Sequence, residues 1–167
     1  QHEENKLVMF NEGGLTIPSA ISKVLDEATI EFCMRSTKNV SYSHQVGPGW
    51  GKFLFHNDGN GTISVGWESS KNNRLDVSKV FTSTARWYHI AIVIKGNTLA
   101  LYVNGTKKGQ ITSPSYSGLP AFGNLQFGKT DSNQWWYGGL DEIRVWSKAR
   151  TQTEIRQNMR IPIAMPA

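Results

Sequence analysis

The chain has 167 residues and a formal net charge of +5, and its length allows one domain that buries roughly two-thirds of the surface its unfolded form exposes. Its 38% hydrophobic content, with 16 glycines and 18 aromatic residues, favours a β-rich fold and argues against a helical globule. The longest basic run is Lys107-Lys108 and no apolar run reaches the roughly 18 residues of a membrane span, so the composition argues against a nucleic-acid reader and a membrane-spanning helix.

Strand signals recur about every 8 to 12 residues in the first half of the chain, with turn residues between them. The turn "NEGG" separates the strand-like segments 6–10 and 15–18. Residues 28–36, "ATIEFCMRS", alternate apolar and polar side chains, which predicts a strand with one buried face. Residues 53–67 predict a hairpin that turns at an Asn-Asp-Gly-Asn-Gly cluster.

The second half continues this pattern and ends with a helix signal. Residues 87–94, "WYHIAIVI", are apolar at nearly every position and predict a central strand that is covered on both faces. Gly-Asn and Asn-Gly turns bracket the next strand, 99–103. After the strand-like "LQFGK" and "YGGLDEIRVW", a capping box of Thr151 and Glu154 predicts a helix of one or two turns. We expect one domain over residues 1–160 and a tail or linker over 161–167.

Two long motifs carry a family resemblance. Residues 86–109, "RWYHIAIVIKGNTLALYVNGTKKG", and 137–159, "YGGLDEIRVWSKARTQTEIRQNM", resemble the laminin-G-like, concanavalin A-like jelly-roll family, and "ATIEFCMR" resembles an early strand of that family, with Cys33 where tryptophan is common. The resemblance covers about residues 6 to 159. It implies an all-β, two-sheet antiparallel jelly-roll sandwich with one short C-terminal helix, whose ligands bind on a concave sheet face or at the rim loops.

The same family includes glycosidases, whose two carboxyl groups are about 5 to 5.5 Å apart in retaining enzymes. Such a pair is expected at i and i+2 of one strand, but no two of the 13 acidic residues have that spacing. The neighbours Asp141 and Glu142 point to opposite faces of a strand. A cross-strand pair, Glu31 or Glu68 with Glu142, is the remaining route to a catalytic centre, so a glycoside hydrolase or a glycosidase-associated domain stays an alternative.

Strand alternation gives Asp141 a position at the edge of the core. It predicts that Asp141, Ile143 and Val145 face the core, and that the opposite face carries Glu142, Arg144 and Trp146. A carboxylate at such an edge needs a partner. The resemblance implies a structural Ca²⁺ held by Asp141 and by main-chain carbonyls from around residues 11–14, and oxygen-only ligation suits calcium. The alternative is that Asp141 only accepts backbone N–H bonds.

Aromatic residues in two loops are the best candidates for a binding site. Sugars combine apolar C–H faces with hydroxyl edges, so their sites pair flat rings with amides and hydroxyls. Trp135, Trp136 and Tyr137 stand beside Asn133, and Trp50 stands among glycines in a second loop. Because Trp135 and Trp136 are adjacent, we expect one ring inside the domain and the other outside.

The resulting functional hypothesis is a non-catalytic, lectin-like carbohydrate-binding module of an exported protein, located outside the cell, in the periplasm or on the cell surface. Arg144 would join the site if its face of the sheet is the concave one. We expect poly- or oligosaccharide as the partner and further domains in a larger polypeptide. The third alternative, a structural or adhesion module that contacts protein, predicts a broad apolar rim patch instead of an aromatic groove.

Overall fold

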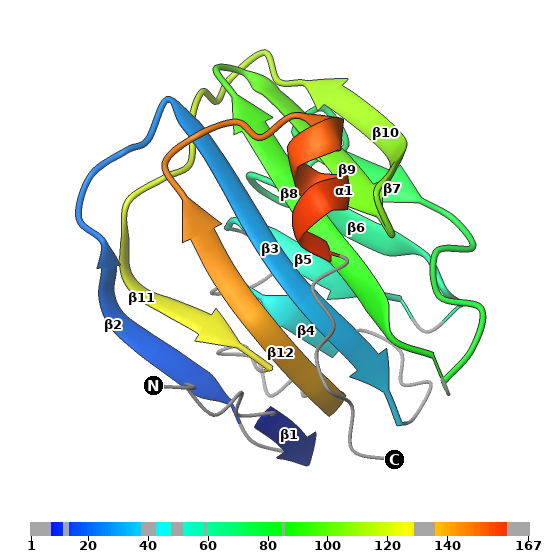
Figure 1. The fold of residues 1–167 in the computed structure, drawn as a ribbon. Coiled ribbons are helices and arrows are strands. Elements are labelled where there is room, and N and C mark those ends of the chain that lie inside the picture. Colours follow the sequence, from blue (N-terminus) through cyan, green and yellow to red (C-terminus); the bar gives the residue numbers. More distant parts are fainter. Residues whose placement is uncertain are drawn as a thin grey trace.

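The computed structural model describes residues 8–11, 14–37, 43–47, 52–58, 60–84, 86–128 and 136–159. This part of the chain forms two antiparallel six-stranded sheets stacked face to face, with one short helix on the outer side of one sheet (Figure 1). The predicted all-β sandwich with a C-terminal helix is therefore confirmed. No helix in these ranges has the length and apolarity that crossing a membrane requires.

Each of the two sheets is built from strands that come from the whole length of the chain. Sheet A contains, in spatial order, β1 (Val8–Asn11), β12 (Tyr137–Trp146), β3 (Glu27–Ser36), β8 (Tyr88–Lys95), β9 (Thr98–Val103) and β10 (Thr106–Thr112). Sheet B contains β2 (Leu15–Ile21), β11 (Phe122–Phe127), β4 (Ser43–Val46), β5 (Leu54–Asn57), β6 (Ile63–Gly66) and β7 (Arg74–Val77). We call the two ends of the sandwich the Glu27 end and the Ser36 end, after the first and last residues of β3.

The core fills the space between the sheets. Phe32 of sheet A meets Phe55 of sheet B edge to face, with ring centroids 5.3 Å apart. Isoleucines of β8 point into this core, while Ala91 on the opposite face of the same strand is also fully buried. The central strand predicted from "WYHIAIVI" is thus covered on both faces, because the helix α1 (Gln152–Met159) lies over β8 and β9 on the outer side of sheet A (Figure 1).

The strand β3 differs from its prediction of one buried face. Thr29 and Glu31, which point away from the core, are 0% and 2% exposed. The segment after β12 covers them: the Thr29 hydroxyl donates to the carbonyl of Lys148 at 2.7 Å and accepts from the amide of Arg150 at 3.0 Å. An alternating sequence pattern shows which side chains are polar but not whether they are exposed, because a polar side chain can be buried where it finds such hydrogen-bond partners.

The face predicted for Asp141 of β12 is wrong, because the strand contains a β-bulge, whereas Ile143 packs against the core and Arg144 lies on the outer face as predicted. Asp141 pairs with Cys33 but Arg144 pairs with Glu31, so β12 has one residue more than β3 over this stretch. Glu142 takes the extra position with a φ of 50°. Asp141 and Arg144 therefore share the outer face of sheet A, and Asp141 does not share the core face with Ile143.

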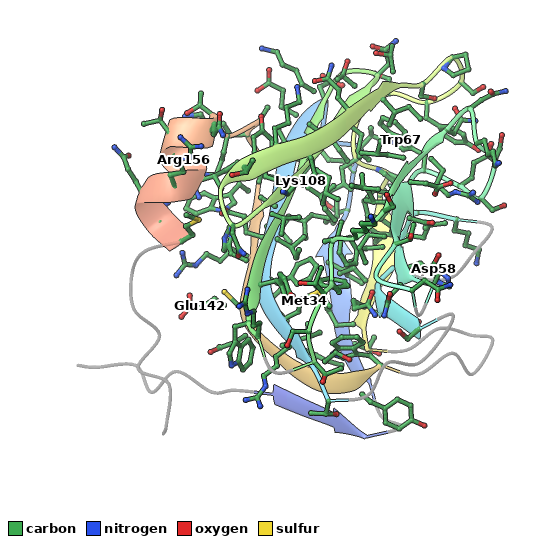
Figure 2. The ribbon with its side chains drawn as sticks, turned by 90° about the vertical axis from the view of Figure 1, so that its right-hand side faces the viewer. Met34, Asp58, Trp67, Lys108, Glu142 and Arg156 are labelled. Carbon is green, nitrogen blue, oxygen red and sulfur yellow. The ribbon has the colours of Figure 1, made fainter. Side chains whose placement is uncertain are left out.

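The C-terminal helix forms as its sequence predicts. The amide of Thr151 donates to Glu154 Oε2 at 2.8 Å, and the amide of Glu154 donates to Thr151 Oγ1 at 3.2 Å, which completes the capping box. Ile155 is the buried residue of α1 and anchors it to the sheet. Figure 2 shows Arg156 of α1 and Glu142 on the side of sheet A that faces away from sheet B, with Met34 between the sheets. The predicted tail, 161–167, lies outside the described residues.

Candidate functional site

A hollow of about 550 Å³ lies at the Ser36 end of the sandwich. It collects residues from three separate parts of the chain: the end of β3, the turn between β5 and β6, and the segment that leads toward β8. The described residues that line it are Ser36, Asn57, Asn60, Gly61, Phe81, Thr82, Ser83 and Thr84.

The turn between β5 and β6 forms one wall of this hollow. Asp58 Oδ1 accepts hydrogen bonds from the amides of Asn60 at 2.8 Å and Thr62 at 3.2 Å, a local bond pattern that closes the turn predicted from its sequence. Gly61 has a φ of +77°, and a Cβ there would lie 2.3 Å from the carbonyl oxygen of Phe81. Glycine thus lets the turn lie directly against the segment 81–84.

The segment 81–84 forms the opposite wall, and Tyr88 of β8 holds it in place. Its ring meets the Phe81 ring edge to face, with centroids 5.0 Å apart, and its hydroxyl accepts from the amide of Thr82 at 3.1 Å. Val80 also donates its amide to the carbonyl of Gly61 at 2.7 Å, which joins the two walls. The hollow therefore has a fixed frame of main chain and one supported aromatic ring.

The chemistry of the hollow is polar and uncharged in its described part. Amides and hydroxyls supply hydrogen-bond donors and acceptors, and Phe81 supplies an apolar surface. A volume of about 550 Å³ falls within the range of small-ligand sites. The lining residues described include no carboxylate, so they offer a neutral polar ligand many partners but no acid and base pair.

The structure describes only some of the residues that the sequence predicted for the rim-loop site. Trp50, Asn133 and Trp135 lie outside the described residues. Trp136 is 1% exposed and belongs to the core, so its ring offers no face to a ligand, and its predicted place in a binding site needs correction. Tyr137 is half-buried at the start of β12.

Asn133 and Trp135 lie between two described residues, Gly128 and Trp136, that are bonded to each other. The amide of Trp136 donates to the carbonyl of Gly128 at 2.8 Å, which ties the two ends of segment 129–135 together. The amide of Thr37, next to the hollow residue Ser36, donates to the carbonyl of Tyr137 at 3.0 Å. The described residues that flank the predicted aromatic segment, Gly128 and Trp136, therefore lie at the same end of the sandwich as the hollow.

Arg144, the remaining predicted contact, lies away from the hollow. It sits on the outer face of sheet A and pairs with Glu142. Beside this pair lies a void of only about 20 Å³, bordered by Glu31, Cys33 and His89, which has room for roughly one water molecule. Arg144 thus belongs to a packed polar cluster.

Glu31 is the centre of this cluster. Its Oε2 accepts from Arg150 Nη1 and from Trp146 Nε1, each at 2.6 Å, and its Oε1 lies 3.7 Å from His89 Nε2. Burial lowers the pKa of His89, an effect that the Glu31 carboxylate opposes. Burial also raises the pKa of the Cys33 thiol to about 12, with Asp141 adding to the shift. The arrangement is typical of a buried structural network.

In the cross-strand pair of Glu31 and Glu142, which the sequence left open as a catalytic centre, each carboxylate is paired with an arginine. Glu31 binds Arg150 and Glu142 binds Arg144. Neither carboxylate belongs to the described lining of the hollow.

Asp141 makes the bond expected under the alternative to calcium. Its Oδ1 accepts the N–H of Glu142 at 2.8 Å. Asn11 pairs with Tyr137, four residues along β12 from Asp141, or roughly 13 Å at strand spacing. Asn11 is thus too far from Asp141 to share an ion with it, while residues 12 and 13 of the predicted donor stretch lie outside the described residues, so calcium stays a prediction. Across the ranges that the structure covers, no three His, Cys, Asp or Glu side chains form a metal-binding group.

The other location expected for ligands, a sheet face, carries a polar row on sheet B. His56, Ser64 and Asp76 lie opposite one another on β5, β6 and β7. Ser64 Oγ donates to Asp76 Oδ1 at 2.7 Å, and Arg74 pairs with the same oxygen at 2.7 Å. Although burial alone would raise the pKa of Asp76, the hydrogen bonds from Arg74 and Ser64 hold it below its usual value. Ser64, Asp76 and Arg74 thus bond to one another, whereas the hollow is open.

The family model of the concanavalin A-like lectin/glucanases superfamily matches residues 11–156. The chain belongs to this superfamily. A search of curated protein sequences found no match for this concanavalin A-like domain.

Solved structures with the same fold include several carbohydrate-binding domains. A candidate carbohydrate-binding protein from Bacteroides ovatus is 21% identical with a TM-score of 0.76, and the match covers 93% of this chain and 47% of that one. Domain 4 of an extracellular arabinanase from Geobacillus stearothermophilus, solved with arabinotriose, is 16% identical with a TM-score of 0.70, covering 93% and 77%. The CBM40 domain of the Ruminococcus gnavus IT-sialidase is 12% identical with a TM-score of 0.67, covering 87% and 95%. At these identities the likeness shows the fold alone.

Proposed function

We propose that this domain is a carbohydrate-binding module that holds a neutral oligosaccharide in the hollow at the Ser36 end. The observation that carries the proposal is the composition of that hollow, which places amides, hydroxyls and one supported phenyl ring around about 550 Å³ of space. This hollow is much larger than the void of about 20 Å³ beside Arg144, and the partners in it match the chemistry of a sugar.

The physical argument follows from the two kinds of surface on a sugar ring. Each hydroxyl donates and accepts hydrogen bonds, and the side chains of Asn60, Thr82 and Thr84 can do the same. An apolar C–H face gains free energy when it leaves water for an aromatic surface, which Phe81 provides. Because the described lining carries no charged side chain, binding does not have to desolvate an ion.

The fold relatives support this proposal by what their names say of them. One was solved with arabinotriose, one is a CBM40 domain of a sialidase, and one is a candidate carbohydrate-binding protein. The chain spans 47% of the Bacteroides ovatus chain. We therefore propose a binding module that works beside further domains of an exported protein, secreted, periplasmic or on the cell surface.

The test is a glycan-array screen, followed by titration calorimetry with the best neutral oligosaccharide. Asn60→Ala and Thr84→Ala each remove one exposed polar group from the hollow, and each should weaken binding about three- to tenfold, since one hydrogen bond contributes about 0.5–1.5 kcal/mol. Thr153→Ala removes an equally exposed hydroxyl from α1 and should leave affinity unchanged. Binding to no glycan, or equal affinity for all three variants, would reject the hollow as the site.

Trp50, Asn133 and Trp135 remain predicted contributors, as does the calcium ion. Trp135→Ala should weaken binding more than the single hydrogen-bond variants, because an aromatic platform contributes a larger apolar area. Addition of a chelator tests the ion separately. An unchanged melting temperature with excess chelator would remove calcium from the proposal.

A further inference from the structure

A second aromatic surface lies at the Glu27 end, opposite the hollow. Tyr116 is 40% exposed, and one face of its ring stacks on Trp67, with centroids 6.4 Å apart and planes 6° apart. Trp67 itself is 3% exposed. The tyrosine ring therefore covers the tryptophan with one face and presents the other to solvent.

A closed network of hydrogen bonds fixes the direction of this ring. The Tyr116 hydroxyl donates to Glu68 Oε2 at 3.2 Å, and Glu68 Oε1 accepts from Asn73 Nδ2 at 2.7 Å. Ser113 Oγ donates to Asn73 Oδ1 and accepts from the amide of Tyr116 at 2.9 Å. The chain of bonds thus starts and ends on Tyr116, and it links segment 113–119 to the hairpin loop 67–73.

The tryptophan beneath is held as firmly. Its indole Nε1 donates to the carbonyl of Gly118 at 2.7 Å, and its amide donates to the carbonyl of Asn73 at 3.0 Å. Gly118 has a φ of +78°, and a Cβ there would lie 2.6 Å from the carbonyl oxygen of Leu25. An aromatic ring held in this way loses little conformational entropy when a ligand covers it.

From this geometry we propose that Tyr116 and Glu68 form a second carbohydrate subsite. The exposed ring face takes the apolar side of a sugar ring, and the Glu68 carboxylate at its edge accepts hydrogen bonds from sugar hydroxyls. A carboxylate that accepts from a hydroxyl makes a stronger bond than a neutral acceptor does. The ligand class rests on the function proposed for the hollow, but the subsite shares no residue with it.

The two subsites face in opposite directions along the sandwich. Ser36 borders the hollow, and β3 runs from there to Glu27, ten residues or roughly 30 Å at strand spacing. Segment 113–119 joins that far end through paired hydrogen bonds between Leu25 and Leu119, at 3.0 and 2.8 Å. Figure 2 shows Trp67 and, lower on the same side of the molecule, Asp58, whose neighbour Asn57 lines the hollow. One domain therefore engages two separate chains of a polysaccharide, or two distant stretches of one.

The experiment follows backbone amide signals by NMR while neutral hexasaccharides of β-glucan, xylan and arabinan are added. Two separate sets of shifts are expected, one in residues 57–62 and 80–84 and one in 67–73 and 113–119. Tyr116→Ala should remove the second set and lower the calorimetric stoichiometry from two to one. Tyr116→Phe keeps the ring and should retain stacking with a several-fold loss of affinity, because one of the two bonds that orient Glu68 is gone.

The matched control is Thr84→Ala, which should weaken the hollow and leave the shifts at Tyr116 intact. Shifts at Tyr116 without shifts at the hollow would reject the hollow and keep the second subsite. Shifts at the hollow alone, with unchanged stoichiometry in Tyr116→Ala, would overturn the second subsite and keep the hollow. If no hexasaccharide moves the signals of loops 67–73 and 113–119, the subsite is rejected. Thermal melts of each variant separate loss of binding from loss of folding.

Discussion

Replacing Arg150 with methionine is expected to destabilise the domain strongly and leave sugar binding unchanged. The Arg150 and Glu31 side chains are 7% and 3% exposed, and they form an ion pair at 2.6 Å. Removing one partner of such a pair leaves the other buried without a counter-charge, which costs about 3–5 kcal/mol. Arg150 also lies 4.3 Å from the centroid of the Trp146 ring, so a cation–π contact is lost as well.

Chemical denaturation followed by far-UV circular dichroism measures the loss in free energy of unfolding, and a thermal melt measures the accompanying fall in Tm. At about 2–4 °C per kcal/mol for a chain of this size, Tm should fall by roughly 6 to 20 °C in Arg150→Met. The double variant Glu31→Gln/Arg150→Met should recover part of the loss, because the buried charge is gone.

The matched control is the exposed pair of Lys95 in β8 with Glu27 in β3, the strand that also carries Glu31. Its atoms are 3.6 Å apart and its side chains 74% and 41% exposed. Lys95→Met should cost less than about 1 kcal/mol. A loss in Arg150→Met no larger than in Lys95→Met, or a double variant no more stable than the single one, would refute the view of Glu31 as a buried anion that needs its partner.

Three further predictions concern single positions. Burial lowers the pKa of His56 from 6.5 to about 4, so its contribution to stability is complete above pH 6.5 and is lost as the pH falls toward 4; His56→Gln should flatten urea-denaturation stability across that window. Because burial raises the pKa of Cys33 to about 12, alkylation at pH 8 should be slow in the native protein and fast in urea, and equal rates would contradict this. Gly61→Ala should lower stability and glycan affinity together, since its Cβ would meet Phe81, whereas Gly96→Ala, with a φ of +56° and no atom within 4 Å of its Cβ, should cost only about 1–2 kcal/mol and leave affinity unchanged.

Local patterns were sufficient to predict the type of fold. The apolar run of β8, the Asn-Gly turn before β10 and the capping box of α1 each depend on residues close together in the chain, and each formed as expected. The face on which Asp141 of β12 lies was not predictable in this way. A single residue in a left-handed conformation, Glu142, moved Asp141 to the other face, and nothing in an alternating pattern signals that bulge.

The hollow was missed for a related reason. Its residues come from three stretches that only the stacking of two sheets brings together, and each stretch alone is typical of an ordinary turn or loop. The cluster 57–61 was correctly predicted as a turn, but its closeness to segment 81–84 depends on Gly61 and is a tertiary property. Trp136 illustrates the reverse case, because an aromatic residue in a polar loop sequence turned out to fill the core.

The bond between Gly128 and Trp136 has a consequence for how such domains diversify. The sandwich itself holds the two ends of these seven residues together, because the amide nitrogen of Trp136 lies 2.8 Å from the carbonyl oxygen of Gly128. The entropy of closing a loop changes only slowly with its length, by about 0.6 kcal/mol for each doubling. A sequence of another length can therefore be inserted between Gly128 and Trp136 at a small entropic cost, and we expect β11, β12 and the core to keep their places.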